Sequence, residues 1–157
     1  MAHNLTEKDF ETTSWHDNIV YGLRFDVGDS FRNDWRSDLV LDIDHIVEWI
    51  CGTAGGAQFR VAPASLIFHD VTDLKLAVDF GDSGHRTAMN ELSIDAITRE
   101  RIEDQKICLD RPYYRWRIAF NLPRGGEIGF GASGFSMELR ADPVLTGEQR
   151  LAAADRA

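Results

Sequence analysis

The sequence is poor in three features that would assign a function directly: cysteine, basic charge and long apolar runs. Its two cysteines, Cys51 and Cys108, lack the CxxC spacing that is typical of zinc and redox sites. Lys and Arg number 17 against 26 Asp and Glu, which leaves a formal net charge of −9. Because nucleic acids are bound through clustered basic side chains, we expect no nucleic-acid partner.

No apolar run approaches the roughly 18 residues of a membrane helix, so we expect no membrane partner. The opening "MAHNLTEKDFETTSW" has neither the basic start nor the apolar stretch of a signal peptide, which predicts a cytoplasmic protein. There is no GxSxG motif, and the glycines of "GGEIGFGASGF" alternate with apolar residues instead of preceding a helix. We expect no cofactor, and these absences favour a non-enzymatic function.

Much of the chain alternates apolar and polar residues with the period of two that is typical of half-buried strands. The alternation is clear at residues 19–27 and 74–80, and again at 116–120, 128–132 and 135–139. The last three segments are separated by short turns, which predicts an antiparallel meander. Many short strands with almost no helix indicate an all-β fold, an antiparallel β-sandwich or a barrel-like sheet.

The ends of the chain differ from its middle. Residues 1–14 are polar and without periodicity, so we expect a loose N-terminal tail. Residues 15–157 are expected to form a single β domain. This domain includes a short C-terminal helix after Pro143, because Thr146 and Gln149 have the spacing of a capping box.

Residues 38–50, "DLVLDIDHIVEWI", fit two secondary structures. As a helix they form an apolar stripe with Ser37 as the N-cap and Gly52 as the terminator. As a strand they place Leu39 to Trp49 alternately on an apolar face. The content of Val, Ile, Trp and Asp disfavours a helix, so we predict a strand on which His45 is a hydrogen-bonded core residue.

Two His-Asp pairs are the most conspicuous candidates for chemistry. His16-Asp17 lies in "SWHDN" before a strand, and His69-Asp70 lies in "FHDVTD" between two strands. Neighbouring residues on a strand point to opposite faces, so one pair cannot easily bind one metal ion. We expect the two Asp to shape turns. The alternative is a ligand, metal or catalytic site in which His16 and His69 converge with their neighbouring Asp.

An acidic row is the second candidate. If residues 38–50 form a strand, Asp42, Asp44 and Glu48 share the face opposite the apolar one. The segment lacks the glycine-punctuated loop that surrounds a calcium ion. We therefore expect these three carboxylates to bind a basic protein partner, and the sequence leaves a homodimer open.

Three short motifs resemble a group of small bacterial domains and one of the all-β immunity-protein families of polymorphic toxin systems. They are a His-Asp pair near the start, a Phe-x-x-Val-x-x-Leu strand and a late apolar strand that ends in Pro. In this chain they are Trp15 to Asp17, then Phe68, Val71 and Leu74, then Phe135 to Pro143. The resemblance implies a bacterial cytosolic binding protein, an immunity or accessory protein with an acidic surface for a basic toxin, and it carries over no catalytic residue.

Overall fold

The structure, a computed structural model, describes residues 4–81, 91–103 and 110–156. In these ranges the strands are β1 (Ile19–Val27), β2 (Ser37–Thr53), β3 (Gly56–His69), β4 (Thr72–Ala77), β5 (Leu92–Arg101), β6 (Tyr114–Leu122), β7 (Glu127–Ala132), β8 (Gly134–Leu139) and β9 (Val144–Thr146). Three short 3-10 helices accompany them, η1 (Glu7–Thr12), η2 (Ser30–Arg32) and η3 (Ala153–Arg156). Among the residues in these ranges, no helix is long and apolar enough to cross a membrane.

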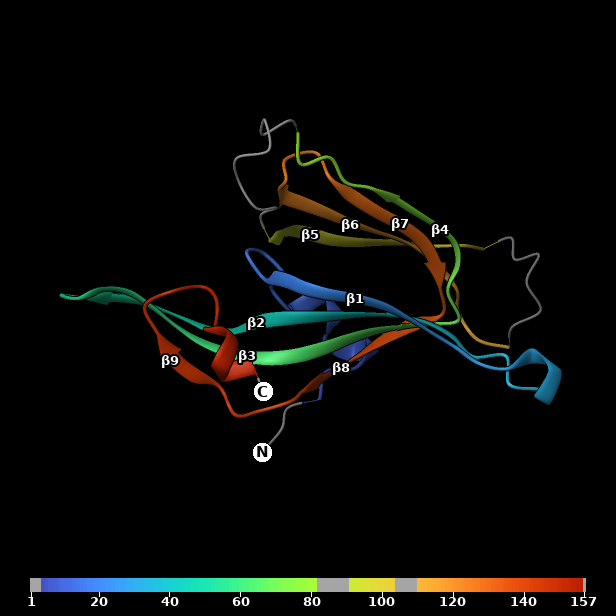
Figure 1. The fold of residues 1–157 in the computed structure, drawn as a ribbon, viewed down its shortest axis with the longest axis horizontal. Helices are drawn as coiled ribbons and strands as arrows, with labels where there is room; N and C mark the ends of the chain where they lie inside the picture. Colours follow the sequence, from blue (N-terminus) through green and yellow to red (C-terminus); the bar gives the residue numbers. More distant parts are fainter. Residues whose placement is uncertain (1–3, 82–90, 104–109, 157) are drawn as a thin grey trace.

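All strands belong to one antiparallel sheet in the order β4-β7-β6-β5-β1-β2-β3-β8, with β9 paired to β3. The sheet is folded into two layers, one of β4 to β7 and one of β1, β2, β3, β8 and β9 (Figure 1). β1 joins the layers on one side, although it pairs with β5 only through Ile19 and Val20. This arrangement confirms the predicted all-β sandwich or barrel-like sheet.

The other side of the sandwich is closed by two segments, β3–β4 and β7–β8, each of which passes from one layer to the other without a reversal of chain direction. β3 continues into β4 and β7 continues into β8, so one antiparallel ladder runs from His69–Gly134 to Thr72–Gly131 across the corner. The Ser133 backbone N–H donates to the His69 carbonyl at 2.9 Å and keeps the ladder continuous. The chain can turn here because Asp70 adopts a left-handed conformation with φ of 55°.

The predicted meander is therefore only partly correct. β6 and β7 pair as a hairpin, but β8 pairs with β3 in the other layer. Ser133 alone separates β7 from β8, and this spacing is shorter than the two-residue loop that a tight hairpin needs. The chain bends at this point instead of folding back. The apolar residues of β8 still face the core, as the alternation predicts.

The core between the layers is aromatic. Phe68 from β3 meets Trp116 of β6 and Phe130 of β7 at ring-centroid distances of 5.1 and 4.8 Å. The alternation predicted for β6 and β7 is confirmed, since Trp116, Ile118, Phe130 and their period-two neighbours are buried. Edge-to-face geometry predominates among these rings, and it adds to the stabilisation from burial alone.

The strand prediction for residues 38–50 is correct, and β2 is longer than expected. Leu39, Leu41 and Ile43 face the core with no exposed surface. The regular register against β3 breaks between Ile46 and Glu48, which places a β-bulge at Val47. A bulge inserts one extra residue and reverses the side-chain alternation beyond it.

Residues 4–14 are packed against the sheet, in contrast to the predicted loose tail. Leu5 forms a β-bridge with Met137, and the Phe10 side chain is buried. The Glu7 carboxylate accepts a hydrogen bond from the Phe135 N–H and pairs with Arg99. One isolated aromatic in a polar segment gives no periodic signal, and its ring partners Trp116 and Phe135 lie more than 100 residues away in the sequence.

The C-terminal helix is a single 3-10 turn, η3, and the predicted capping box is absent. Gln149 donates to Asp17 at 2.9 Å, while Thr146 Oγ1 accepts from the Glu148 N–H in a local turn. Leu151 is buried on the outer face of β2 and β3 against Ile46. Contacts with the sheet, rather than a helical hydrogen-bond ladder, order this segment.

We expect Phe68→Ala to lower the free energy of unfolding by about 3–5 kcal/mol, because it leaves a cavity where the two layers meet. Phe31→Ala is the matched control, since the Phe31 side chain is fully exposed. It is expected to change stability by less than about 0.5 kcal/mol. Urea denaturation of both variants measures the difference, and equal losses would contradict the position of the core.

Candidate functional site

The first His-Asp pair forms the turn that leads into β1. Asp17 has φ of 64°, and its carboxylate accepts hydrogen bonds from Asn121 at 2.8 Å and Gln149 at 2.9 Å. It thereby ties the start of β1 to β6 and to the C-terminal segment. The His16 side chain is half-exposed and lies 3.1 Å from Asp17 and 3.5 Å from Asp95.

The second His-Asp pair forms the corner between β3 and β4. His69 Nε2 lies 2.9 Å from Ser136 Oγ, and Nδ1 lies 3.3 Å from an Asp38 carboxylate oxygen. Asp70 is bonded to Ser133 Oγ and lies 3.4 Å from Arg111. The imidazole and the carboxylate of this pair have different partners, so each side chain stabilises the corner through its own contacts.

The structure does not bring His16 and His69 together. The His69 partner Asp38 stands at the beginning of β2, whereas the strand that follows the His16 turn begins opposite Asp44. Six residues of extended chain separate those two positions, which corresponds to about 20 Å. Across residues 4–81, 91–103 and 110–156, no three His, Cys, Asp or Glu side chains are grouped as metal ligands.

The acidic row Asp42, Asp44 and Glu48 is not a continuous surface. Asp44 is completely buried and accepts hydrogen bonds from the Leu151 N–H at 3.0 Å and from Arg156 Nη2 at 2.7 Å. The C-terminal segment therefore covers a carboxylate that the sequence assigned to partner binding. Nothing in the local pattern of β2 signals that a distant arginine neutralises this position.

The other two carboxylates are separated by the bulge at Val47. Asp42 is mostly buried and bonded to Arg24 at 2.8 Å on the outer face of the sheet. Glu48 lies opposite Arg60, beyond the bulge, and pairs with it at 3.0 Å. Because the bulge reverses the alternation, Glu48 leaves the face of Asp42 and Asp44. The prediction that the three residues form one partner surface is corrected accordingly.

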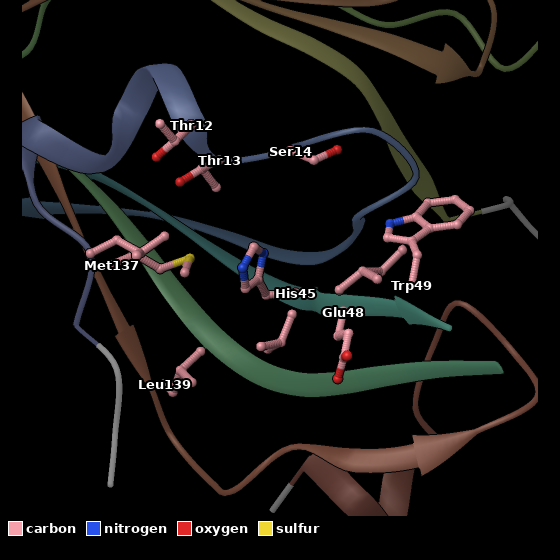
Figure 2. Close-up of a pocket in the computed structure, with 11 residues that line it drawn as sticks. Thr12, Thr13, Ser14, His45, Glu48, Trp49, Met137 and Leu139 are labelled. Atoms are coloured by element: carbon pink, nitrogen blue, oxygen red, sulfur yellow. The ribbon is translucent and has the colours of Figure 1, made fainter. Parts of the chain in front are cut away.

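A pocket of about 330 Å³ lies where the N-terminal segment crosses the inner face of β2 and β8. Figure 2 shows the His45 ring standing among the lining side chains, between Met137 and Glu48. The lining is mainly apolar, with three hydroxyl residues on one wall. It comprises Leu5, Thr12, Thr13, Ser14, His45, Ile46, Val47, Glu48, Trp49, Met137 and Leu139.

His45 is held in one tautomer by Asn18, which is completely buried. Asn18 Oδ1 accepts the Ile46 N–H at 3.0 Å, so the amide nitrogen of Asn18 is the atom 3.1 Å from His45 Nδ1. An amide nitrogen can only donate, and Nδ1 must therefore accept. The neutral imidazole then has its proton on Nε2. The predicted hydrogen-bonded core histidine is confirmed.

Burial lowers the pKa of His45 to about 4 from its ordinary value of 6.5, because the charged form would lose its hydration. The imidazole is consequently neutral at physiological pH. Among the residues that the structure describes, Nε2 has no hydrogen-bond partner. The sequence signal for this arrangement was weak: an Asn after a His-Asp pair and a histidine in an apolar alternation 27 residues later.

Four large apolar side chains are exposed at the end of the β1–β2 hairpin. We call the side chains of Phe25, Val27, Phe31 and Trp35 the hairpin patch, and their exposed fractions are 55, 67, 101 and 73%. η2 and the adjoining strand ends extend beyond the rest of the sandwich on this side (Figure 1). The alternation of residues 19–27 predicts the strand, but it does not indicate that Phe25 and Val27 at its end are exposed.

Comparisons with protein-family models, with curated proteins and with solved structures found no match to this chain. The candidate sites therefore stand on the geometry of this molecule. Two of its features are unusual for a small sandwich: a neutral buried histidine that faces a pocket, and four large apolar side chains exposed on one projecting hairpin.

The neutral state of His45 predicts a pH dependence of stability. Between pH 6.5 and 4 the unfolded chain binds a proton that folded His45 does not, so the free energy of unfolding falls as the pH decreases through this window. The contribution of His45 reaches about 3 kcal/mol by pH 4. His45→Gln keeps an acceptor for Asn18 and does not titrate. Its stability relative to wild type should rise from pH 7.5 to 4.5, and a constant difference would contradict the assignment.

Because Asp44 is buried, we expect a conservative substitution at this position to lower the free energy of unfolding strongly. Asp44→Asn removes the charge that neutralises Arg156, and we expect a loss of about 3 kcal/mol in the free energy of unfolding. Glu48→Gln is the control, because the Glu48–Arg60 pair is exposed. Its expected effect is less than about 1 kcal/mol in the same urea titration. Equal effects would place Asp44 on the surface after all.

Proposed function

We propose that this chain is a bacterial cytosolic binding protein that contacts a basic protein partner through the hairpin patch. The observation that carries the proposal is the exposure of Phe25, Val27, Phe31 and Trp35 together on one projecting hairpin. Exposed apolar clusters of this kind mark interaction sites, and aromatic side chains dominate the binding energy of interfaces.

The edge of β1 adds a second mode of contact on the same hairpin. β1 pairs with β2 from Ile19 to Val27, but with β5 only at Ile19 and Val20. Within the described parts of the chain, the segment from Tyr21 to Val27 thus has one edge without a strand partner. A partner strand could add to this edge, with Phe25 and Val27 providing side-chain contacts.

Charge supports a basic partner, although not through the acidic row. At the end of the hairpin two arginines meet three aspartates: Arg36 lies 3.3 Å from Asp26 and 3.6 Å from Asp34, and Arg32 lies 3.4 Å from Asp29. The hairpin patch therefore combines exposed apolar side chains with a small excess of negative charge, within a chain of net charge −9. Such a surface binds through its apolar centre, while the field of the whole protein accelerates the approach of a cationic partner.

The resemblance to immunity proteins of toxin systems agrees with this function, because those proteins act by binding. An immunity or accessory role for this chain is part of the proposal. The alternative, a catalytic or metal site formed jointly by His16 and His69, has no support from the positions of the two rings, because His69 contacts Asp38 at the beginning of β2 and the strand after His16 begins opposite Asp44.

The test places a photo-crosslinking phenylalanine analogue at Phe31 or Trp35 in cells of the native host. Val144 and Leu122, which are also exposed, provide control positions away from the hairpin. We expect one specific adduct from positions 31 and 35 only, with a partner of basic isoelectric point. No adduct, or equal adducts at all four positions, would overturn the proposal, and an acidic partner would refute its electrostatic part.

With the purified partner, Phe31→Ser combined with Trp35→Ser should raise Kd at least about tenfold, because both side chains are interface anchors of the preferred type. Added salt should slow association more than it speeds dissociation. Leu122→Ser is the matched control and should leave Kd unchanged. An unchanged Kd in the double variant would show that the partner binds elsewhere.

A further inference from the structure

We propose that the pocket around His45 is a binding site for a small neutral molecule that has an apolar body and one carbonyl-type hydrogen-bond acceptor. The site is separate from the hairpin patch. It is formed by β2, β8 and the N-terminal segment, and none of the four hairpin-patch residues lines it. Its volume of about 330 Å³ lies near the lower end of the range for ligand pockets, which suits a fragment-sized molecule.

The donor in this site is the Nε2–H of His45. The side chain is 6% exposed, and Figure 2 places its ring among the residues that line the pocket. Nδ1 is occupied by Asn18, whereas Nε2 lacks a hydrogen-bond partner among the residues described. Nε2 is not one of the fully enclosed atoms without a partner, so its N–H is open to the pocket, and a ligand oxygen there would accept a hydrogen bond from it.

A second ring donor near the pocket is also unsatisfied. The indole Nε1 of Trp15 is buried without a hydrogen-bond partner, and the Trp15 ring centroid lies 6.0 Å from that of His45. Buried polar atoms without partners are rare in native proteins. A buried indole N–H of this kind, beside the His45 ring that faces the pocket, indicates a place for an acceptor that the chain itself does not provide.

The remaining walls define the rest of the ligand. Leu5, Met137 and Leu139 contribute apolar surface on one side, and Val47 and Trp49 contribute it on the other. The hydroxyls of Thr12 and Thr13 already donate to the Asp9 carbonyl, so they offer little further donation. The ligand body that fits between these walls is therefore apolar.

The fixed tautomer excludes two other ligand classes. A metal ion needs a lone pair on Nε2, but Asn18 holds the proton on that nitrogen. An anion would lack a positive partner, because burial lowers the pKa of His45 and keeps its ring neutral. Glu48 lines the same pocket and adds a negative charge. The ligand class that remains is a neutral molecule with a hydrogen-bond acceptor.

The test uses acetophenone, N-methylbenzamide and cyclohexanone as probes of the proposed class. Ethylbenzene, which has the size of acetophenone without its oxygen, reports the contribution of the acceptor, and benzoate reports that of charge. Titrations are followed by the ¹⁵N signals of the His45 ring and of the Trp15 and Trp49 indoles. We expect saturable shifts with at least one carbonyl probe, and binding of ethylbenzene and benzoate that is about threefold to tenfold weaker.

Two valines of equal exposure provide matched variants, because Val47 lines the pocket and Val144 does not, and both side chains are 41% exposed. Val47→Trp should fill the pocket and abolish probe binding without touching the Asn18–His45 pair. Val144→Trp should bind the probes as wild type does. Folding of both variants is checked by the dispersion of their amide spectra.

Three outcomes would overturn the proposal. They are the absence of saturable shifts with every carbonyl probe, equal affinity for ethylbenzene and acetophenone, and unchanged probe binding in Val47→Trp. The last outcome would place any observed binding outside this pocket. Loss of binding in Val47→Trp alone, together with a preference for the carbonyl probes, would establish the site.

Discussion

The contact of aromatic rings between the two layers is the interaction on which the rest of the molecule depends. Phe68 stands on the strand that changes layer, and it meets Trp116 and Phe130 from the facing layer. Phe10 adds a ring from the N-terminal segment, 5.2 Å from Trp116. Both layers and the segment that lines the pocket are thus fixed by one cluster, since hydrophobic burial is the largest favourable contribution to folding.

This packing requires the chain to turn sharply at the ends of its long strands. Both His-Asp pairs occur at such turns, and both Asp residues adopt left-handed backbone conformations, with φ of 64° at Asp17 and 55° at Asp70. Aspartate tolerates this conformation better than most residues. The repeated aromatic-His-Asp sequence is therefore explained by backbone geometry, and the histidines are side chains of corners, each with its own polar partners.

Features that depend on the local alternation of apolar residues were predicted correctly from the sequence. Features that depend on contacts with distant segments were not. The strand character of residues 38–50 followed from Leu39, Leu41 and Ile43, which are all buried. The role of Asp44 could not be predicted from this segment, because its partner Arg156 lies 112 residues away in the chain. The bulge at Val47 has no local signal either, yet it alone moves Glu48 to the other face. In the candidate site, the buried state of His45 was predictable, but its tautomer depends on Asn18.

A mismatch in strand length accounts for the pocket but not for the hairpin patch. β2 has 17 residues and β3 has 14, whereas β7 and β4 have 6 each. The longer layer therefore extends past the shorter one, and its inner face needs another cover there. At one end the N-terminal segment provides that cover and leaves the His45 pocket beneath it. At the other end Phe25 lies opposite the buried Leu39, but it is 55% exposed, because the pairing of β1 with β5 ends at Val20. The excess length of β2 therefore accounts for the pocket, whereas the exposure of Phe25 and Val27 follows from the short pairing of β1 with β5.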